Sequence, residues 1–178
     1  MTPPGLRIRP AVLADAAVLA ELMARTFRDA FGAHNRPEDL AAHLARSYGI
    51  AQQERELADP AITVLLAEID GAACGYAQLR DGVAPPAAVR GVAPLQLWRF
   101  YLDQAWVGRG IAQPLMEAAK QAARSRGART LWLGAWEKNP RGLAFYRKAG
   151  FEVAGTLVFQ VGDDAQTDLV MVHDLASD

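Results

Sequence analysis

The sequence predicts an α/β (α+β) fold in which one mixed, mostly antiparallel sheet carries helices on both faces. Three observations support this prediction. Short β-branched and apolar runs alternate with longer segments in which apolar residues recur at helical spacing. Asp70-Gly71 separates two apolar runs and is a strong hairpin signal. Segments 97–103, 110–126 and 130–136 are typical of strand, helix and strand, and together predict one parallel crossover.

The first part of the chain is typical of one strand followed by three helices. Residues 6–9 alternate apolar and polar side chains, as a strand does. Pro10 and the alanine-rich segment after it open a helix that Gly32 ends. A second helix starts at Pro37 and runs to about Arg46, and a third covers residues 51–58 before Pro60. The apolar positions expected to face the core from the first helix are Val12, Leu13, Val18, Leu19, Leu22, Met23 and Phe27.

Strands dominate the rest of the chain. The hairpin strands cover residues 63–69 and 73–79. Residues 81–94, rich in Pro and Gly, are too irregular for a helix or strand, and we expect them to form a wall near a binding site. The elements after the crossover are a helix at 140–149 that Gly150 ends, and strands at 152–161 and 167–174 linked by Gly162-Asp163-Asp164.

Composition narrows the function. The 178 residues are expected to form a single domain, 1–178, which buries roughly 70% of its unfolded surface. The net charge of −1 gives no drive toward nucleic acid or an anionic membrane. No apolar run is long enough for a membrane span, and the N-terminus lacks the apolar core of a signal peptide. The single cysteine, Cys74, permits no internal disulfide, so we expect a cytoplasmic protein. His34, His43 and His173 fit no metal-ligand spacing, and no metal is expected.

A glycine pair after the 97–103 segment is the strongest local signal. Gly108 and Gly110 stand between a strand and a helix, where glycine lets the backbone approach a ligand closely. The first amides of the following helix point at such a ligand, and the helix dipole favours negative charge there. The turn therefore predicts an anion site, of the kind that holds a pyrophosphate.

Two motifs in order resemble the GNAT family of N-acetyltransferases. The family has a pyrophosphate loop of the form Q-x-x-G-x-G/A, and residues 107–112 match it at Gly110 and Ala112. A later family segment, N-x-x-A-x-x-F-Y-x-K-x-G-F, corresponds to residues 139–151. The resemblance covers roughly residues 60 to 175. It implies acetyl-CoA as the co-substrate, no metal, and two parallel strands that splay apart around the pantetheine arm.

The resemblance also implies roles for individual residues. The backbone amide of Leu102 would polarise the thioester carbonyl, and Tyr146 would protonate the departing thiolate. Asn139 would bind the cofactor or cap the helix that follows it, and Lys148 would reach the adenosine phosphates. The chain departs from the family at Val107, in place of glutamine or arginine, which leaves a cradle of backbone groups. The cofactor residues implied are Tyr101, Leu102, Val107, Gly108, Arg109, Gly110, Ile111, Ala112, Asn139, Tyr146 and Lys148.

The acceptor amine must lose a proton before it attacks, and two carboxylates are candidates for the base. Glu137 ends the strand beside the expected splay, and we assign it the catalytic role. Asp103, at the end of the 97–103 strand, is the alternative.

Several segments look like the bacterial PaiA-type acetyltransferases, which are described as acting on spermidine and spermine. The most specific is Gly162-Asp163-Asp164-Ala165-Gln166-Thr167-Asp168-Leu169. The resemblance implies a small amine such as a polyamine as acceptor, with the segment 26–39 forming a second wall. A protein N-terminal or lysine acetyltransferase, a non-catalytic acyl-CoA sensor and a homodimer remain open. An acidic acceptor cleft could draw on Asp163, Asp164, Asp168, Glu38, Asp39, Glu54 and Glu56.

Overall fold

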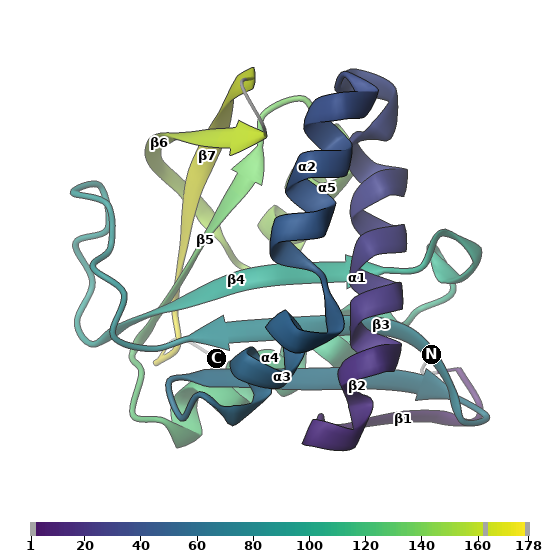
Figure 1. The fold of residues 1–178 in the computed structure, drawn as a ribbon. Coiled ribbons are helices and arrows are strands. Elements are labelled where there is room, and N and C mark those ends of the chain that lie inside the picture. The colour runs from purple at the N-terminus through teal and green to yellow at the C-terminus, as the bar shows by residue number, and fades with distance from the viewer. Residues whose placement is uncertain (1–2, 162–163, 177–178) are drawn as a thin grey trace.

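The computed structural model describes residues 3–161 and 164–176, and within them seven strands form one sheet in the order β1-β2-β3-β4-β5-β7-β6 (Figure 1). Neighbouring strands are antiparallel except β4 and β5, which are parallel. The mixed, mostly antiparallel sheet is therefore confirmed. The strands are β1 Leu6–Pro10, β2 Ile62–Ile69, β3 Ala72–Arg80, β4 Pro94–Leu102, β5 Thr130–Trp136, β6 Glu152–Val161 and β7 Asp164–Asp174.

Helices cover both faces of the sheet, as predicted. One face carries α1 (Ala16–Phe31), α2 (Pro37–Ser47) and α3 (Ile50–Ala58), which stand in front of the sheet in Figure 1. The other face carries α4 (Ala112–Ser125) and α5 (Pro140–Lys148). Each layer has its own apolar core, so the sheet is buried on both sides.

The first helix starts later than the sequence predicts. Pro10 is the last residue of β1, and α1 begins only at Ala16, after a single 3-10 turn. The reason is the carboxylate of Asp15. It accepts the amide of Val12 at 2.8 Å and pairs with the guanidinium of Arg9 at 2.7 Å, which fixes a turn before the helix.

Three residues of the expected core are exposed. The late start leaves Val12 and Leu13 outside α1, 56% and 60% exposed, whereas Val18 lies within α1 on its solvent side. Their assignment to the core was wrong. The remaining apolar positions of the pattern are buried as expected: Leu19, Leu22, Met23 and Phe27.

The two predicted hairpins form. Asp70 and Gly71 have φ angles of 49° and 83°. A two-residue hairpin turn needs positive φ angles at both positions, because its twist must match that of the flanking strands. In the second hairpin, Val161 pairs with Asp164, so β7 begins three residues before the predicted start. The predicted link residues Gly162 and Asp163 lie outside the described residues.

The parallel strands part soon after they meet. Only residues 94–96 of β4 pair with β5, opposite residues 130–132. Beyond Gln96, β4 continues beside β3 while β5 turns away toward β6 and β7 (Figure 1). One edge of β4, up to Leu102, therefore has no strand beside it, which is the splay that the family resemblance implied.

Candidate active site

The open edge of β4 presents the backbone of Leu102. The amide of the next residue, Asp103, donates to Cys74 O at 2.9 Å, so it points toward β3. Successive amides of a strand point to opposite sides. The Leu102 amide therefore points into the gap between β4 and β5, where a carbonyl oxygen that gains charge would find a donor.

The side chains at this edge alternate between the two faces. The Phe100 ring packs against Phe145 and Tyr146 of α5, with centroids 5.5 and 6.3 Å away. The Tyr101 ring lies on the α1 face, stacked on Tyr76 at 5.8 Å. Aromatic groups therefore flank the gap from both sides of the sheet.

The turn that follows leads directly into α4. Gly108 and Gly110 have φ angles of 82° and 80°, a conformation that other residues adopt only with strain. Ile111 is the N-cap of α4, and no side chain caps this helix. The amides of its first turn have no intrahelical acceptor, so they are available to an anion.

Charged side chains lie around this turn. Arg109 is exposed and its guanidinium lies 5.3 Å from the centre of the Trp106 ring. Arg141, at the start of α5, places Nη2 3.8 Å from where a Cβ on Gly108 would lie. Sequence reasoning gave Arg141 no role. Its position two residues after Asn139 was the only available signal, because its nearness to Gly108 depends on how α5 packs.

Asn139 caps α5. Its side-chain oxygen accepts the amide of Gly142 at 2.9 Å. This contact also explains the glycine where the family has alanine, since a Cβ on Gly142 would lie 2.6 Å from Asn139 Nδ2. The capping part of the prediction is confirmed, and a cofactor contact by Asn139 stays a prediction.

Tyr146 stands beside the gap on the α5 side. Its ring contacts Phe151 at 6.0 Å and Phe145 at 5.6 Å between centroids. Burial, with a smaller effect from Asp168, raises the pKa of the Tyr146 phenol well above its usual value, so the hydroxyl keeps its proton at neutral pH. Lys148, two residues after Tyr146 in α5, is exposed.

The two carboxylates predicted as bases differ in availability. Glu137 is exposed just after β5, and its amide donates to Thr167 O at 3.1 Å. Asp103 binds Arg25 of α1 at 2.8 Å and accepts the amide of Ala105 at 3.0 Å. A cation and a backbone amide therefore already occupy the Asp103 carboxylate.

A third carboxylate, Asp168, is close enough to Tyr101 and Tyr146 to contribute to the raised pKa values of both phenols. It is 7% exposed, in the middle of β7, opposite Trp136 of β5. In residues 3–161 and 164–176, no group hydrogen-bonds its Oδ1. Burial, assisted by the negative charge of Glu137, raises the pKa of Asp168 to about 6.

Other members of the expected acidic cleft have different partners. Glu56 is buried, with Arg99 at 2.8 Å and Gln78 at 2.7 Å on one carboxylate oxygen. Asp39 pairs with Arg36 at 2.7 Å. The expectation that these two supply free negative charge to an acceptor was wrong, because buried carboxylates need such partners. Asp163 lies outside the described residues.

Two segments flank Asp168 on its face of the sheet. The 81–93 loop packs Val89 against Trp132 of β5 and Val170 of β7. On the other side, His34 lies 4.9 Å from the Trp136 ring, and Asn35 accepts a hydrogen bond from Gln166 at 2.7 Å. The 81–93 loop and the residues just after α1 thus both lie on this face of the sheet, and their role as walls of an acceptor site stays a prediction.

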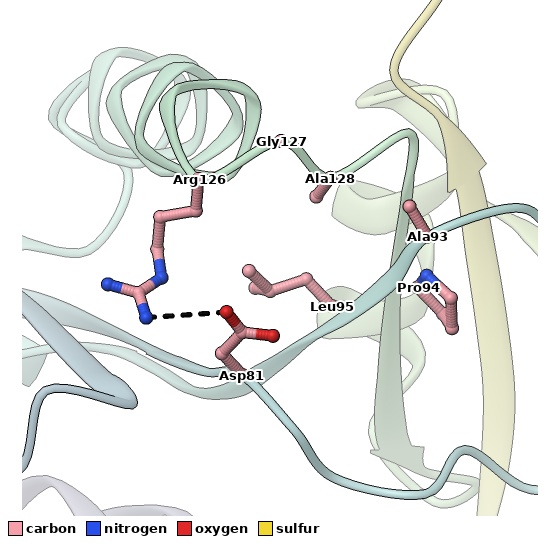
Figure 2. Close-up of a pocket in the computed structure, with 7 residues that line it drawn as sticks. All are labelled: Asp81, Ala93, Pro94, Leu95, Arg126, Gly127 and Ala128. Carbon is pink, nitrogen blue, oxygen red and sulfur yellow. Dashed lines mark hydrogen bonds and ion pairs between the residues drawn. The ribbon is translucent and has the colours of Figure 1, made fainter.

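A small polar hollow lies elsewhere, where β4 begins and α4 ends. Arg126 and Asp81 face each other across it at 3.4 Å (Figure 2). Pro94 and Leu95, at the start of β4, line it, whereas Leu102 stands at the opposite end of that strand. The hollow is thus separate from the gap.

Two further findings concern the described residues. No three His, Cys, Asp or Glu side chains among them lie close enough together to hold a metal ion. None of the described helices combines the length and the apolar character needed to cross a membrane.

Residues 19–151 match the model of the acetyltransferase (GNAT) family, and the chain belongs to this family. An uncharacterised N-acetyltransferase of Mycobacterium tuberculosis is 35% identical over 163 residues, which are 92% of this chain and 99% of the relative. Another, from Lactobacillus delbrueckii subsp. lactis, is 34% identical over 146 residues, 82% of this chain and 84% of the relative.

Solved structures share the fold. The PaiA N-acetyltransferase of Thermoplasma acidophilum, in complex with coenzyme A, has a TM-score of 0.76 and 19% identity, and the match covers 98% and 99% of the two chains. The YncA putative acetyltransferase of Salmonella typhimurium, with acetyl-CoA, has a TM-score of 0.66 and 21% identity, covering 96% and 94%. The chain is an acetyl-CoA-dependent N-acetyltransferase, and the family acts on small-molecule or peptide acceptors.

Proposed function

We propose that this protein transfers the acetyl group of acetyl-CoA to the primary amine of a small acceptor, by direct attack of the amine on the thioester. The observation that carries the proposal is the open edge of β4. It runs without a neighbouring strand to the Leu102 amide, and the glycine turn of residues 107–112 follows within a few residues. The extended, amide-containing arm of acetyl-CoA would fit the open edge of β4, and the phosphates of the same molecule would fit the turn.

The residues of the turn would hold the pyrophosphate through backbone amides, with Gly108 and Gly110 allowing close approach. Ile111 and Ala112 contribute the start of α4, and Arg109 and Arg141 add positive charge. Backbone groups of Tyr101 and Leu102 would pair with the arm of the co-substrate, while Asn139 and Lys148 would reach it from α5.

The Leu102 amide would stabilise charge on the carbonyl oxygen as the new bond forms. The Tyr146 hydroxyl would donate to the sulfur as the C–S bond breaks. Because its pKa is raised, the phenol stays protonated and suits a donor's role. Glu137, exposed after β5, would attract the cationic acceptor toward the gap.

A small acceptor is favoured over a protein substrate. The 81–93 loop and the end of α1 flank the space beside Asp168, which suits a compact molecule better than an extended peptide. A polyamine is the first candidate, because Asp168 and Glu137 both bring negative charge and because the PaiA N-acetyltransferase shares the fold. We further propose that residues 1–178 act as one cytoplasmic domain, with a homodimer left open.

Release of free coenzyme A across a panel of amines tests the proposal. The panel contains spermidine, spermine, aminoglycosides, free amino acids and short peptides. We expect turnover with small amines and at least a 100-fold lower kcat for Tyr146→Phe, with acetyl-CoA affinity unchanged. Tyr48→Phe is the matched control, since Tyr48 is a buried tyrosine beside Arg99 outside the gap. Turnover with peptides alone would overturn the small acceptor, and binding without turnover would indicate a sensor.

A further inference from the structure

The carboxylate of Asp168 is unusual among the acidic groups near the gap. Asp103 is held by Arg25, and Glu137 is exposed to water. Asp168 is buried, and among the described residues nothing hydrogen-bonds its Oδ1. A buried carboxylate without a partner is costly for the folded protein. Such a cost is expected where a group serves a ligand.

The strand surface next to Asp168 is exposed at one residue of β5. Gly134 is exposed, although every other residue of β5 is buried. Trp132 and Trp136 stand two residues away on either side of it, on the same face of the strand. The strand surface at Gly134, between the two indoles and next to Leu157, is therefore uncovered, and we call it the slot. The Asp168 carboxylate borders this slot, since a Cβ on Gly134 would lie 3.1 Å from Oδ2.

We propose that the slot over Gly134 receives the ammonium group of the acceptor and that Asp168, in place of the predicted Glu137, is the catalytic base that removes its proton. This inference rests on the acetyltransferase function proposed above. The indoles of Trp132 and Trp136 suit a cationic headgroup with an apolar stem, because aromatic rings attract cations and bury methylene groups.

The electrostatic surroundings support this role. Burial and the charge of Glu137 raise the pKa of Asp168 to about 6. Tyr101 of β4 and Tyr146 of α5 are the other titratable groups whose pKa values respond to Asp168, and both are raised chiefly by burial, so both are neutral at pH 7. Asp168 is thus ionised at neutral pH and a stronger base than an ordinary aspartate.

The reaction balances with these groups. The acceptor enters as R–NH₃⁺ and gives its first proton to Asp168, which frees the nitrogen lone pair. That pair forms the N–C bond to the carbonyl carbon, and the electrons of the breaking C–S bond leave on sulfur. The second nitrogen proton ends on the thiolate by way of the Tyr146 hydroxyl. Asp168 then releases its proton to water, so one ammonium and one thioester give one amide, one thiol and one proton.

The test compares kcat/KM from pH 5 to 9 for wild type, Asp168→Asn and Asp168→Glu, with the panel amine that wild type acetylates fastest. We expect wild-type activity to rise with pH around a midpoint near 6. Asp168→Asn should lose about 100-fold or more at pH 7.5 and lose that midpoint, with acetyl-CoA affinity within twofold of wild type. Asp168→Glu should retain part of the activity and a shifted midpoint. Asp174→Asn, an exposed position of the same strand, is the control and should match wild type.

The outcomes separate the inference from the function on which it rests. If wild type acetylates an amine and Asp168→Asn keeps both its rate and its acid midpoint, Asp168 is not the base and only this inference fails. If wild type binds acetyl-CoA but acetylates nothing, the proposed function fails as well. Should Asp168→Asn not fold, Asp168→Glu supplies the result: a pH profile identical to that of wild type would overturn the assignment.

Discussion

Asp168 of β7 lies diagonally across the strand pair from Gly134 of β5, because Asp168 pairs with Trp136 and Gly134 pairs with Val170, and a Cβ on Gly134 would lie 3.1 Å from Asp168 Oδ2. The glycine leaves room beside a buried carboxylate that would otherwise be sealed within the sheet. A single methyl group at this point would therefore occupy the space that we assign to the acceptor.

Gly134→Ala should weaken acceptor use while leaving the donor site intact. The added methyl must displace Asp168 by a few tenths of an ångström and fill the slot. We expect an acceptor KM about tenfold higher and an acetyl-CoA Kd within twofold of wild type, measured by steady-state kinetics and calorimetry. Gly49→Ala is the control, because its nearest contact would be 3.9 Å away. An unchanged acceptor KM in Gly134→Ala would place the acceptor elsewhere.

Asp168→Asn should stabilise the protein at neutral pH. The pKa of Asp168 is raised in the folded state from 3.8 to about 6, so the folded protein binds this proton more tightly than the unfolded chain does. Stability is therefore lost as pH rises from 4 to 6, by about 3 kcal/mol for a shift of about two units. Urea unfolding should show that the free energy of unfolding of Asp168→Asn, relative to that of wild type, is about 2 kcal/mol higher at pH 7.5 than at pH 4. An equal difference at both pH values would contradict the raised pKa.

Gly110→Ala should separate backbone strain from ligand binding. A left-handed residue other than glycine costs roughly 1–2 kcal/mol, and Gly110 has a φ of 80°. Gly82→Ala is the matched control for Gly110→Ala. Gly82 also has a positive φ, 69°, and it lies away from the gap with open space around it. Urea unfolding should show a similar loss for both variants, whereas calorimetry should show acetyl-CoA binding weakened at least tenfold only for Gly110→Ala. Equal binding by both variants would argue against the turn as the phosphate site.

Glu56→Gln should damage stability and leave acceptor choice unchanged. Glu56 binds Arg99 at 2.8 Å and Gln78 at 2.7 Å in a buried network, and removing one charge of such a pair typically costs about 3–5 kcal/mol. Glu21→Gln, in the exposed pair with Arg25, should cost less than about 1 kcal/mol. Denaturant unfolding measures both. If Glu56→Gln changed the acceptor preference without a loss of stability, Glu56 would be part of the acceptor site after all.

The glycine turn and the helix cap could be predicted because each depends on residues next to one another in the chain. Gly108 and Gly110 are required by positive φ angles, and Asn139 by the free amides at a helix start. The start of α1 could not be predicted from spacing, because the ion pair of Asp15 with Arg9 decides it, and Arg9 belongs to another element. Val12 and Leu13 continue the helical pattern without taking part in the helix.

The sequence indicated Asp168 as one of several acids for an acceptor cleft but did not indicate its burial. In the chain it lies at the start of the predicted strand 167–174, just after the Gly162-Asp163-Asp164 link. Its burial follows from the position of β7 between β5 and β6, which no local pattern specifies. Gly134 was the available signal, since a glycine inside the apolar run of β5 often marks a close approach to that strand.

The sequence by itself determined the order of the elements, the family and the glycine turn to which we assign the phosphates, because these depend on periodicity and on residues whose backbone requirements are local. Tertiary structure decided which carboxylates are available. Asp103 and Glu56 are neutralised by arginines from other elements, whereas Oδ1 of Asp168 has no hydrogen-bond partner among the described residues. Whether a carboxylate is available to a ligand depends on the charged groups that packing brings within a few ångströms of it. Those groups come from distant parts of the chain.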